Sequence, residues 1–95
     1  MARVKAHALH ILVKSERQAQ DLLKKLEHGA KFDLLAKRFS ICPSAKKGGD
    51  LGTFNKGQMV KPFDKAVFDG ELFKVLGPVK TQFGYHLIKV IDRSN

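Results

Sequence analysis

The sequence has few residues of several types, and each shortage narrows what the chain can be. It contains one cysteine, Cys42, so no disulfide can form within its 95 residues; this favours a reducing compartment. No run approaches the roughly 20 apolar residues that span a bilayer. The first 15 residues lack the continuous apolar segment of a secretory signal. We therefore expect a cytoplasmic protein with no membrane contact.

Acidic side chains are also few. Nine Asp and Glu residues stand against 18 Lys and Arg residues, which gives a formal net charge of +9. A basic surface attracts polyanions through steering and counterion release. The basic residues are scattered rather than gathered into one run, however, and this pattern is typical of a solvated surface. A nucleic-acid partner is therefore a secondary interpretation.

The apolar content is sufficient for one small core. Apolar residues make up 43% of the chain, and seven of them are phenylalanines. A length of 95 residues corresponds to one domain, and no repeat or linker divides residues 1–95. Nothing in the sequence indicates an oligomer interface. We expect a single-domain monomer.

Two hydrophobic periods alternate along the chain. Alternating or continuous apolar runs predict strands, and apolar residues three and four apart predict helices. The segment 40–57, with Pro43 and four glycines, is predicted as loop apart from a short strand, and 69–78 gives no clear pattern. The predicted strands are 4–13, 50–54, 79–81 and 85–91, and the predicted helices follow Ser15, start near Phe32, and include Met59 to Val67.

The order of these elements is strand, helix, helix, strand, helix, strand, strand. The last two strands form a hairpin and are therefore antiparallel. We predict an α+β domain in which a four-stranded, mostly antiparallel sheet is surrounded by helices.

Two histidines interrupt apolar strands at opposite ends of the chain. His10 lies in the first strand and His86 in the last. If the strands are neighbours, both imidazoles project from one face and form a hydrogen bond. The alternative is a pair of structural histidines, each satisfied by a backbone group. The residues alone leave both interpretations open. We predict a structural role for His7, on the opposite face from His10, and no functional role for His28.

Cys42 also allows several interpretations. With a distant histidine it would form a nucleophile–base pair, or with His10 and His86 a zinc site. No cysteine-protease signature surrounds it, and no paired CxxC or HxxxH spacing is present. A buried, unreactive thiol is the commoner case, and we predict no metal. Met59 and Phe63 have the spacing of helix core positions, which is their simplest interpretation.

Seven segments, taken in order along the chain, carry a recognisable pattern: 8–14, 32–36, 40–44, 48–52, 57–63, 77–79 and 81–90. Together they resemble the parvulin family of peptidyl-prolyl cis/trans isomerases. The resemblance spans nearly the whole chain in the same order, including the sequences ALHILVK and TQFGYHLIKV near its two ends. It implies a fold of the parvulin and FKBP kind, catalysis of X–Pro bond rotation without a cofactor, a role in protein folding, and proline-containing polypeptides as substrates.

The resemblance also implies the site residues. The family's active-site histidines and cysteine, with a nearby hydroxyl residue, correspond to His10, His86, Cys42 and Thr81. Its pocket for the proline ring corresponds to Leu51, Met59 and Phe63, and its cleft rim to Gln58 and Phe83. We expect a non-covalent mechanism in which Cys42 contributes by its polarity, and a preference for a bulky apolar residue before proline.

The chain departs from the family pattern in two places. Members that need phosphorylated substrates carry a basic loop between the first strand and the first helix. Here Lys14 and Ser15 lead directly into the helix, and Arg17 alone is no substitute for an arginine cluster. We expect no phosphate dependence. The segment 69–76 also replaces a shorter turn, and its conformation is not predicted.

Two alternatives come from other functional classes. The same cleft would serve a chaperone-like module that holds proline-containing segments with weak catalysis. The net charge would serve a basic accessory protein for nucleic acid. Measuring isomerase kinetics and salt-dependent nucleic-acid binding separates the three.

Overall fold

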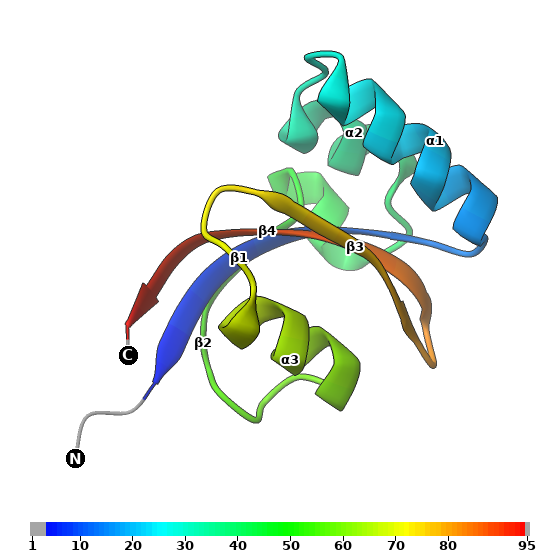
Figure 1. Ribbon diagram of the computed structural model, residues 1–95. Coiled ribbons are helices and arrows are strands. Elements are labelled where there is room, and N and C mark those ends of the chain that lie inside the picture. Colours follow the sequence, from blue (N-terminus) through cyan, green and yellow to red (C-terminus); the bar gives the residue numbers. More distant parts are fainter. Residues whose placement is uncertain (1–3, 95) are drawn as a thin grey trace.

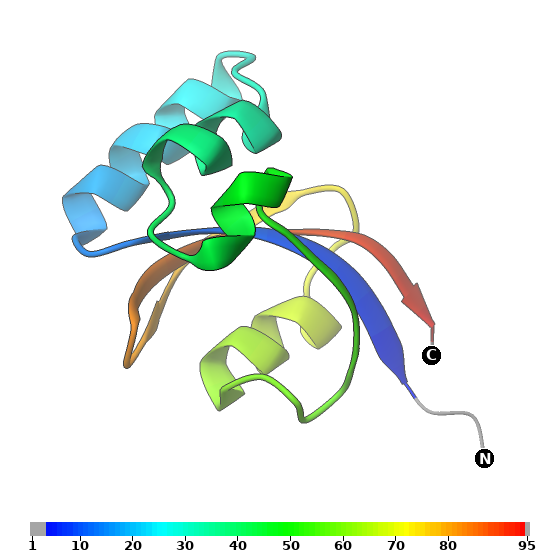
Figure 2. The same cartoon turned by 180° about the vertical axis from the view of Figure 1, so that it is seen from behind.

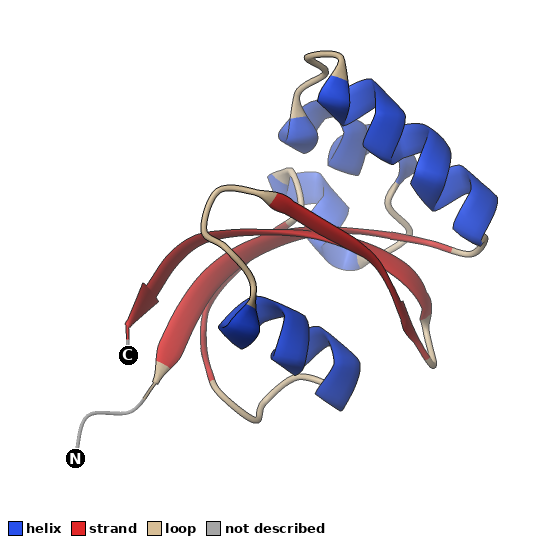
Figure 3. Ribbon diagram, viewed as in Figure 1, coloured by secondary structure: helices blue, strands red, loops and turns tan. Residues whose placement is uncertain are grey.

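The computed structural model of the chain describes residues 4–94, which form one four-stranded sheet with helices on both faces (Figures 1 and 3). The element order agrees with the prediction, except for an additional 3₁₀ helix. The elements are β1 (Lys5–Val13), α1 (Glu16–Glu27), α2 (Phe32–Phe39), η1 (Pro43–Lys47), β2 (Asp50–Asn55), α3 (Lys61–Asp69), β3 (Val75–Thr81) and β4 (Gly84–Ser94).

The sheet has the strand order β2-β1-β4-β3, and all three neighbouring pairs are antiparallel. The first and last strands of the chain therefore lie side by side at its centre. The β1–β4 ladder runs from Lys5 opposite Ser94 to Val13 opposite Tyr85. This central pairing brings residues near the two ends of the sequence together, which is the condition under which His10 and His86 were expected to form a hydrogen bond. The predicted fold class is confirmed.

The local signals at the helices agree with the structure. The Ser15 hydroxyl accepts a hydrogen bond from the Gln18 amide and caps α1, which ends at Glu27, two residues before Gly29. Pro62 lies in the first turn of α3, where its missing amide hydrogen costs no helical bond. None of the helices within residues 4–94 is long and apolar enough to cross a membrane.

Several boundaries differ from the prediction. Helix α3 starts at Lys61, so Met59, predicted inside this helix, lies in the loop that precedes it. Residues 43–47, predicted as loop, form η1, which Gly48 ends in the left-handed region with φ 68°. Strand β3 starts at Val75, because the chain pairs with β4 on both sides of an interruption between Leu76 and Val79. Strand β4 continues to Ser94, because the polar residues after Ile91 still pair with the start of β1.

Each face of the sheet has its own apolar cluster. Helices α1 and α2 cover one face and α3 the other, as the two opposite views show (Figures 1 and 2). On the α1–α2 face, the buried residues are Ile11, Val13, Ala19, Leu22, Phe32, Ala36 and Leu87. On the α3 face, they are Ala6, Ala8, Phe54, Phe63, Val67, Ile88 and Val90. The alternation of side chains along β1 and β4 produces this division.

Candidate active site

A cavity of about 670 Å³ opens on the α3 face of the sheet. Strands β1 and β4, helix α3 and the segment after α2 contribute to its walls. Eight of the nine site residues implied by the family resemblance line this cavity. The polar ones are His10, Cys42, Gln58 and His86, and the apolar ones are Leu51, Met59, Phe63 and Phe83. The ninth, Thr81, contacts His86.

The two imidazoles hydrogen-bond to each other. His10 lies opposite Ile88 and His86 opposite Leu12, so the histidines are diagonal neighbours on one face of the β1–β4 ladder. The Nδ1 atoms of His10 and His86 are 3.1 Å apart, and the rings are stacked at 21° with centroids 5.2 Å apart. The first of the two interpretations of these residues is therefore the correct one.

Hydrogen bonds extend from both ends of the histidine pair. His10 Nε2 is 3.1 Å from the Ser44 hydroxyl oxygen, and His86 Nε2 is 2.7 Å from the Thr81 hydroxyl oxygen. The Thr81 oxygen also accepts a hydrogen bond of 3.1 Å from the Phe83 amide. The four side chains thus form one continuous chain from η1 to the β3–β4 turn, in which each ring nitrogen has a partner.

The hydrogen-bonded chain of these four side chains permits two arrangements of protons. In one, Thr81 donates to His86, His86 Nδ1 donates to His10, and His10 Nε2 donates to Ser44. In the other, all three bonds are reversed. Both arrangements use neutral imidazoles with one proton between the two rings, so the protons along the chain are ordered together.

Burial keeps both histidines neutral. Only 5% of His10 and 4% of His86 is exposed. Desolvation and, to a smaller extent, the nearby His86 together lower the pKa of His10 to about 4. Desolvation also lowers the pKa of His86. At neutral pH the site therefore presents polar but uncharged rings.

The Cys42 thiol is a cavity-lining group without an imidazole partner among residues 4–94. It is half-buried at the start of η1. All four ring nitrogens of the histidine pair are already hydrogen-bonded to other groups. No lone pair is left to activate the thiol or to bind zinc together with it, which argues against both of these interpretations of Cys42.

Phe63 belongs both to the cavity wall and to the core. Its ring makes edge contacts with His10, at a centroid distance of 5.5 Å and 81°, and with His86, at 5.2 Å and 78°. It is only 3% exposed and packs in the α3-face cluster. Phe63 is thus a core residue that also lines the cavity, and its contact with a substrate proline ring stays a prediction.

Ser44 is a site residue that the sequence did not predict. Its hydroxyl fixes His10 Nε2, and its carbonyl accepts a hydrogen bond from the Gly49 amide, whose own carbonyl accepts from the His10 amide. Gly49 has φ 87°, and a β-carbon there would collide with the His10 carbonyl oxygen. The available signal was a hydroxyl residue two positions after Cys42, but only the fold shows what it contacts.

The family model of the PPIC-type PPIase domain, a class of peptidyl-prolyl isomerase domains, matches residues 2–94. The chain belongs to this family. The predicted parvulin resemblance is thereby confirmed, and so is the enzyme class at the level of the family.

Relatives of this PPIC-type domain include both short and longer proteins. The foldase protein PrsA of Geobacillus kaustophilus is 49% identical over 90 residues, which are 94% of this chain and 32% of that protein. The crystal structure of PrsA from Bacillus subtilis matches with a TM-score of 0.89 and 50% identity, over 93% of this chain and 35% of that one. The chain thus spans about a third of the length of the curated relatives it matches.

A short relative has nearly the same extent. The solution structure of NmPin, the parvulin of Nitrosopumilus maritimus, has 45% identity and a TM-score of 0.84, covering 97% of this chain and 99% of that one.

Proposed function

We propose that the chain catalyses cis/trans isomerisation of X–Pro bonds in polypeptides by a non-covalent mechanism and so assists folding. One observation carries the proposal: a hydrogen-bonded pair of neutral imidazoles lies directly beside an open apolar cavity. Membership in the PPIC-type family supports it. The roles of the individual residues are part of this proposal.

The reaction requires little from the protein. Amide resonance sets a barrier of about 18–20 kcal/mol for rotation about the X–Pro bond. A thousandfold acceleration requires about 4 kcal/mol of preferential binding to the twisted amide. The proline ring fits a wall of Leu51, Met59 and Phe63, and gripping it holds one side of the bond while the carbonyl side turns. Met59 adapts to the pucker of the ring.

The polar groups favour the twisted amide because they offer the substrate carbonyl no strong hydrogen-bond donor. Twisting removes resonance, so the carbonyl becomes less polar and the nitrogen more basic. Neutral, buried imidazoles with every nitrogen already hydrogen-bonded offer the carbonyl no strong donor. A site of this polarity stabilises the planar amide less than water does, and the barrier falls. Cys42 adds a weakly polar surface near the turning carbonyl.

Substrate choice follows from the cavity lining. Lys14 is the charged side chain among the lining residues, and a single lysine does not provide the bidentate contacts of an arginine cluster. Ile41 and Phe83 are each 51% exposed at the rim. We propose that a bulky apolar residue before proline is preferred and that phosphorylation is not required.

The test is isomerisation kinetics on a series of X–Pro peptides with wild type and Cys42→Ser. We expect the highest kcat/KM with apolar X and at least about a third of wild-type activity for Cys42→Ser, because no bond to sulfur forms. A best substrate with acidic or phosphorylated X would contradict the proposed specificity. An inactive Cys42→Ser variant, together with a covalent wild-type adduct, would show a nucleophile instead.

The apolar rim also favours a second candidate function, which is holding unfolded segments as a chaperone with weak catalysis. Exposed Ile41 and Phe83 provide a surface for such segments. Suppression of aggregation by a variant without isomerase activity would support this function. Failure to suppress it at excess wild-type protein would exclude it.

Location and oligomeric state stay predictions. The single Cys42 favours the reducing cytoplasm. Light scattering coupled to size-exclusion chromatography tests the monomer, and salt-dependent binding to DNA or RNA tests the nucleic-acid alternative.

A further inference from the structure

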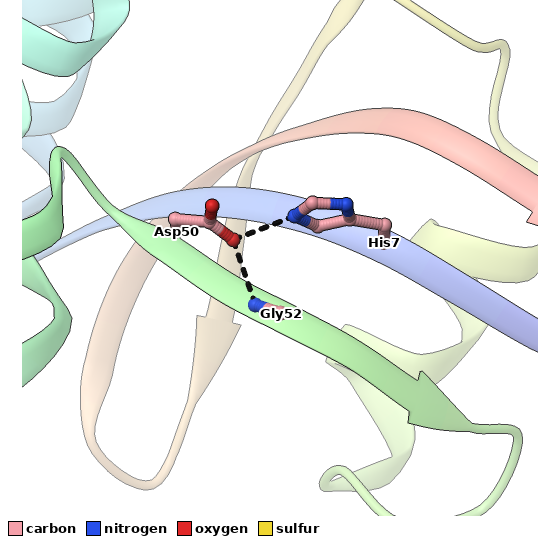
Figure 4. Close-up of polar contacts among 3 residues, drawn as sticks. All are labelled: His7, Asp50 and Gly52. Atoms are coloured by element: carbon pink, nitrogen blue, oxygen red, sulfur yellow. Dashed lines mark hydrogen bonds and ion pairs between the residues drawn. The ribbon is translucent and has the colours of Figure 1, made fainter.

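A second polar cluster lies at the junction of β1 and β2. His7 Nε2 and Asp50 Oδ1 are 2.6 Å apart, and the same carboxylate oxygen accepts a hydrogen bond of 2.7 Å from the Gly52 amide (Figure 4). The side chains of His7 and Asp50 are 31% and 39% exposed. The Asp50 Oδ1 atom therefore contacts both His7 on the neighbouring strand β1 and the backbone amide of Gly52, two residues further along β2.

Leu51 lies between Asp50 and Gly52, the two residues of β2 that this hydrogen bond connects. It lines the cavity and packs against the α3-face cluster. The ladder between β1 and β2 pairs His7 with Thr53 and then Leu9 with Asp50, with a register shift between them. Regular strand pairing is thus interrupted at residues 51 and 52. Gly52 has φ 71°, in the left-handed region, and no atom lies near the position of a β-carbon.

We propose that His7 and Asp50 are positioning residues that hold Leu51 in the cavity wall against the proline ring of the substrate. The inference rests on the proposed function, which it deepens. The Asp50 carboxylate spans Leu51 by contacting its own chain at Gly52, and His7 ties that carboxylate to β1, the strand that carries His10. These two contacts of Asp50 thereby fix the distance between Leu51 in the cavity wall and the histidine pair.

The contact is suited to a constant structural role near neutral pH. The Gly52 amide is the main group that lowers the pKa of Asp50, and the hydrogen bond from His7 acts in the same direction. The carboxylate is therefore charged. An Nε2–H donor is present on His7 both in the charged ring and in the neutral Nε2–H tautomer.

The experiment measures KM and kcat on an X–Pro peptide for His7→Leu, His7→Gln and the matched control His28→Leu, whose histidine is exposed at the end of α1. We expect His7→Leu to raise KM about fivefold with little change in kcat, because a wall that binds the proline ring is displaced. His7→Gln, which retains a side-chain N–H donor, brings KM back to within about twofold of wild type. His28→Leu leaves both constants unchanged.

A double-mutant cycle with Leu51→Ala separates positioning from general destabilisation. If His7 acts through Leu51, His7→Leu has almost no further effect on KM in the Leu51→Ala background. Equal fold-changes in the two backgrounds would overturn the proposal, as would an unchanged KM for His7→Leu.

A readout without substrate keeps this inference distinct from the proposed function. The methyl NMR signals of Leu51 should shift in folded His7→Leu and return toward the wild-type positions in His7→Gln. Absence of isomerase activity in wild type would refute the proposed function, whereas unmoved Leu51 methyl signals in His7→Leu would refute the positioning role.

Discussion

The two faces of the sheet have similar apolar clusters but differ in their polar content. The face under α1 and α2 is packed with aliphatic and aromatic side chains alone. The face under α3 is equally apolar at one end and contains His10, Thr81 and His86 at the other. These three are the buried polar side chains among residues 4–94, and all of them belong to one hydrogen-bonded chain beside the cavity.

This difference indicates where stability and function reside. Burying a polar group is costly unless it is hydrogen-bonded, so a core built for stability alone avoids such groups. The α1–α2 face follows this rule. The α3 face retains three buried polar groups at the cavity, each with its hydrogen bonds, and we attribute their presence to the proposed reaction. Mutations on the two faces should therefore differ in what they affect.

The largest expected effect compares one core side chain from each face. Phe63→Ala removes an aromatic ring from the α3 face and Leu22→Ala an aliphatic side chain from the other. We expect both to lower the free energy of unfolding, by about 3–5 and 2–5 kcal/mol respectively. Only Phe63→Ala should also lower the kcat/KM of the folded protein, by at least about tenfold.

The measurement is urea unfolding together with isomerisation rates corrected for the folded fraction. Phe63→Leu, which keeps more of the side-chain volume, serves where Phe63→Ala is largely unfolded. Equal losses of activity in Leu22→Ala and Phe63→Ala would remove the distinction between the faces.

The next effect concerns pH. The pKa of His10 falls from 6.5 to about 4 on folding, so between these values the unfolded chain binds more protons and folding is less favoured. The contribution of His10 to the free energy of unfolding is fully present above pH 6.5. It is lost as the pH falls toward 4, because the unfolded chain then binds a proton that the buried imidazole does not. It amounts to about 3 kcal/mol.

This prediction is checked by urea unfolding at pH 7 and pH 4.5. Wild type should lose more stability than His10→Asn, whereas His28→Asn, at an exposed position, should match wild type. An equal loss in wild type and His10→Asn would show that the buried histidine does not determine the acid sensitivity.

The smallest expected effect comes from substitutions of Thr81, which lies at one end of the hydrogen-bonded chain. Thr81→Val preserves the shape of the side chain but leaves His86 Nε2 without its partner, which should cost about 1–3 kcal/mol of stability. Thr81→Ser retains the hydroxyl and should keep the hydrogen bond. Chemical denaturation and ¹⁵N NMR of the imidazoles report the two effects. A Thr81→Val protein as stable as wild type, with unchanged ring signals, would contradict the account.

Local patterns predicted the elements well, since each depends on neighbouring residues. Ser15 and Gln18 marked the start of α1, and the alternation of β1 separated His10 from His7. The limits of β3 and β4 were missed because pairing with a distant strand, rather than composition, extends them through Gly77-Pro78 and beyond Ile91.

The site residues could be predicted only where the family resemblance supplied the corresponding positions in this sequence. Spacing could not show that His10 and His86 touch, because 76 positions separate them and the β1–β4 ladder brings them together. The contacts of Ser44 with His10 and of His7 with Asp50 also depend on the three-dimensional path of the chain. The hydroxyl of Ser44 on η1 and the imidazole of His7 on β1 carry no local signal of their partners.

The most direct test of the central claim is the rate of X–Pro exchange, measured by NMR for wild type, Met59→Ala and Leu34→Ala. Met59 lines the cavity on the α3 face, and Leu34 is 56% exposed on α2. We predict that wild type and Leu34→Ala accelerate exchange equally and that folded Met59→Ala is at least about fivefold slower. No acceleration by wild type, or full activity in Met59→Ala, would contradict it.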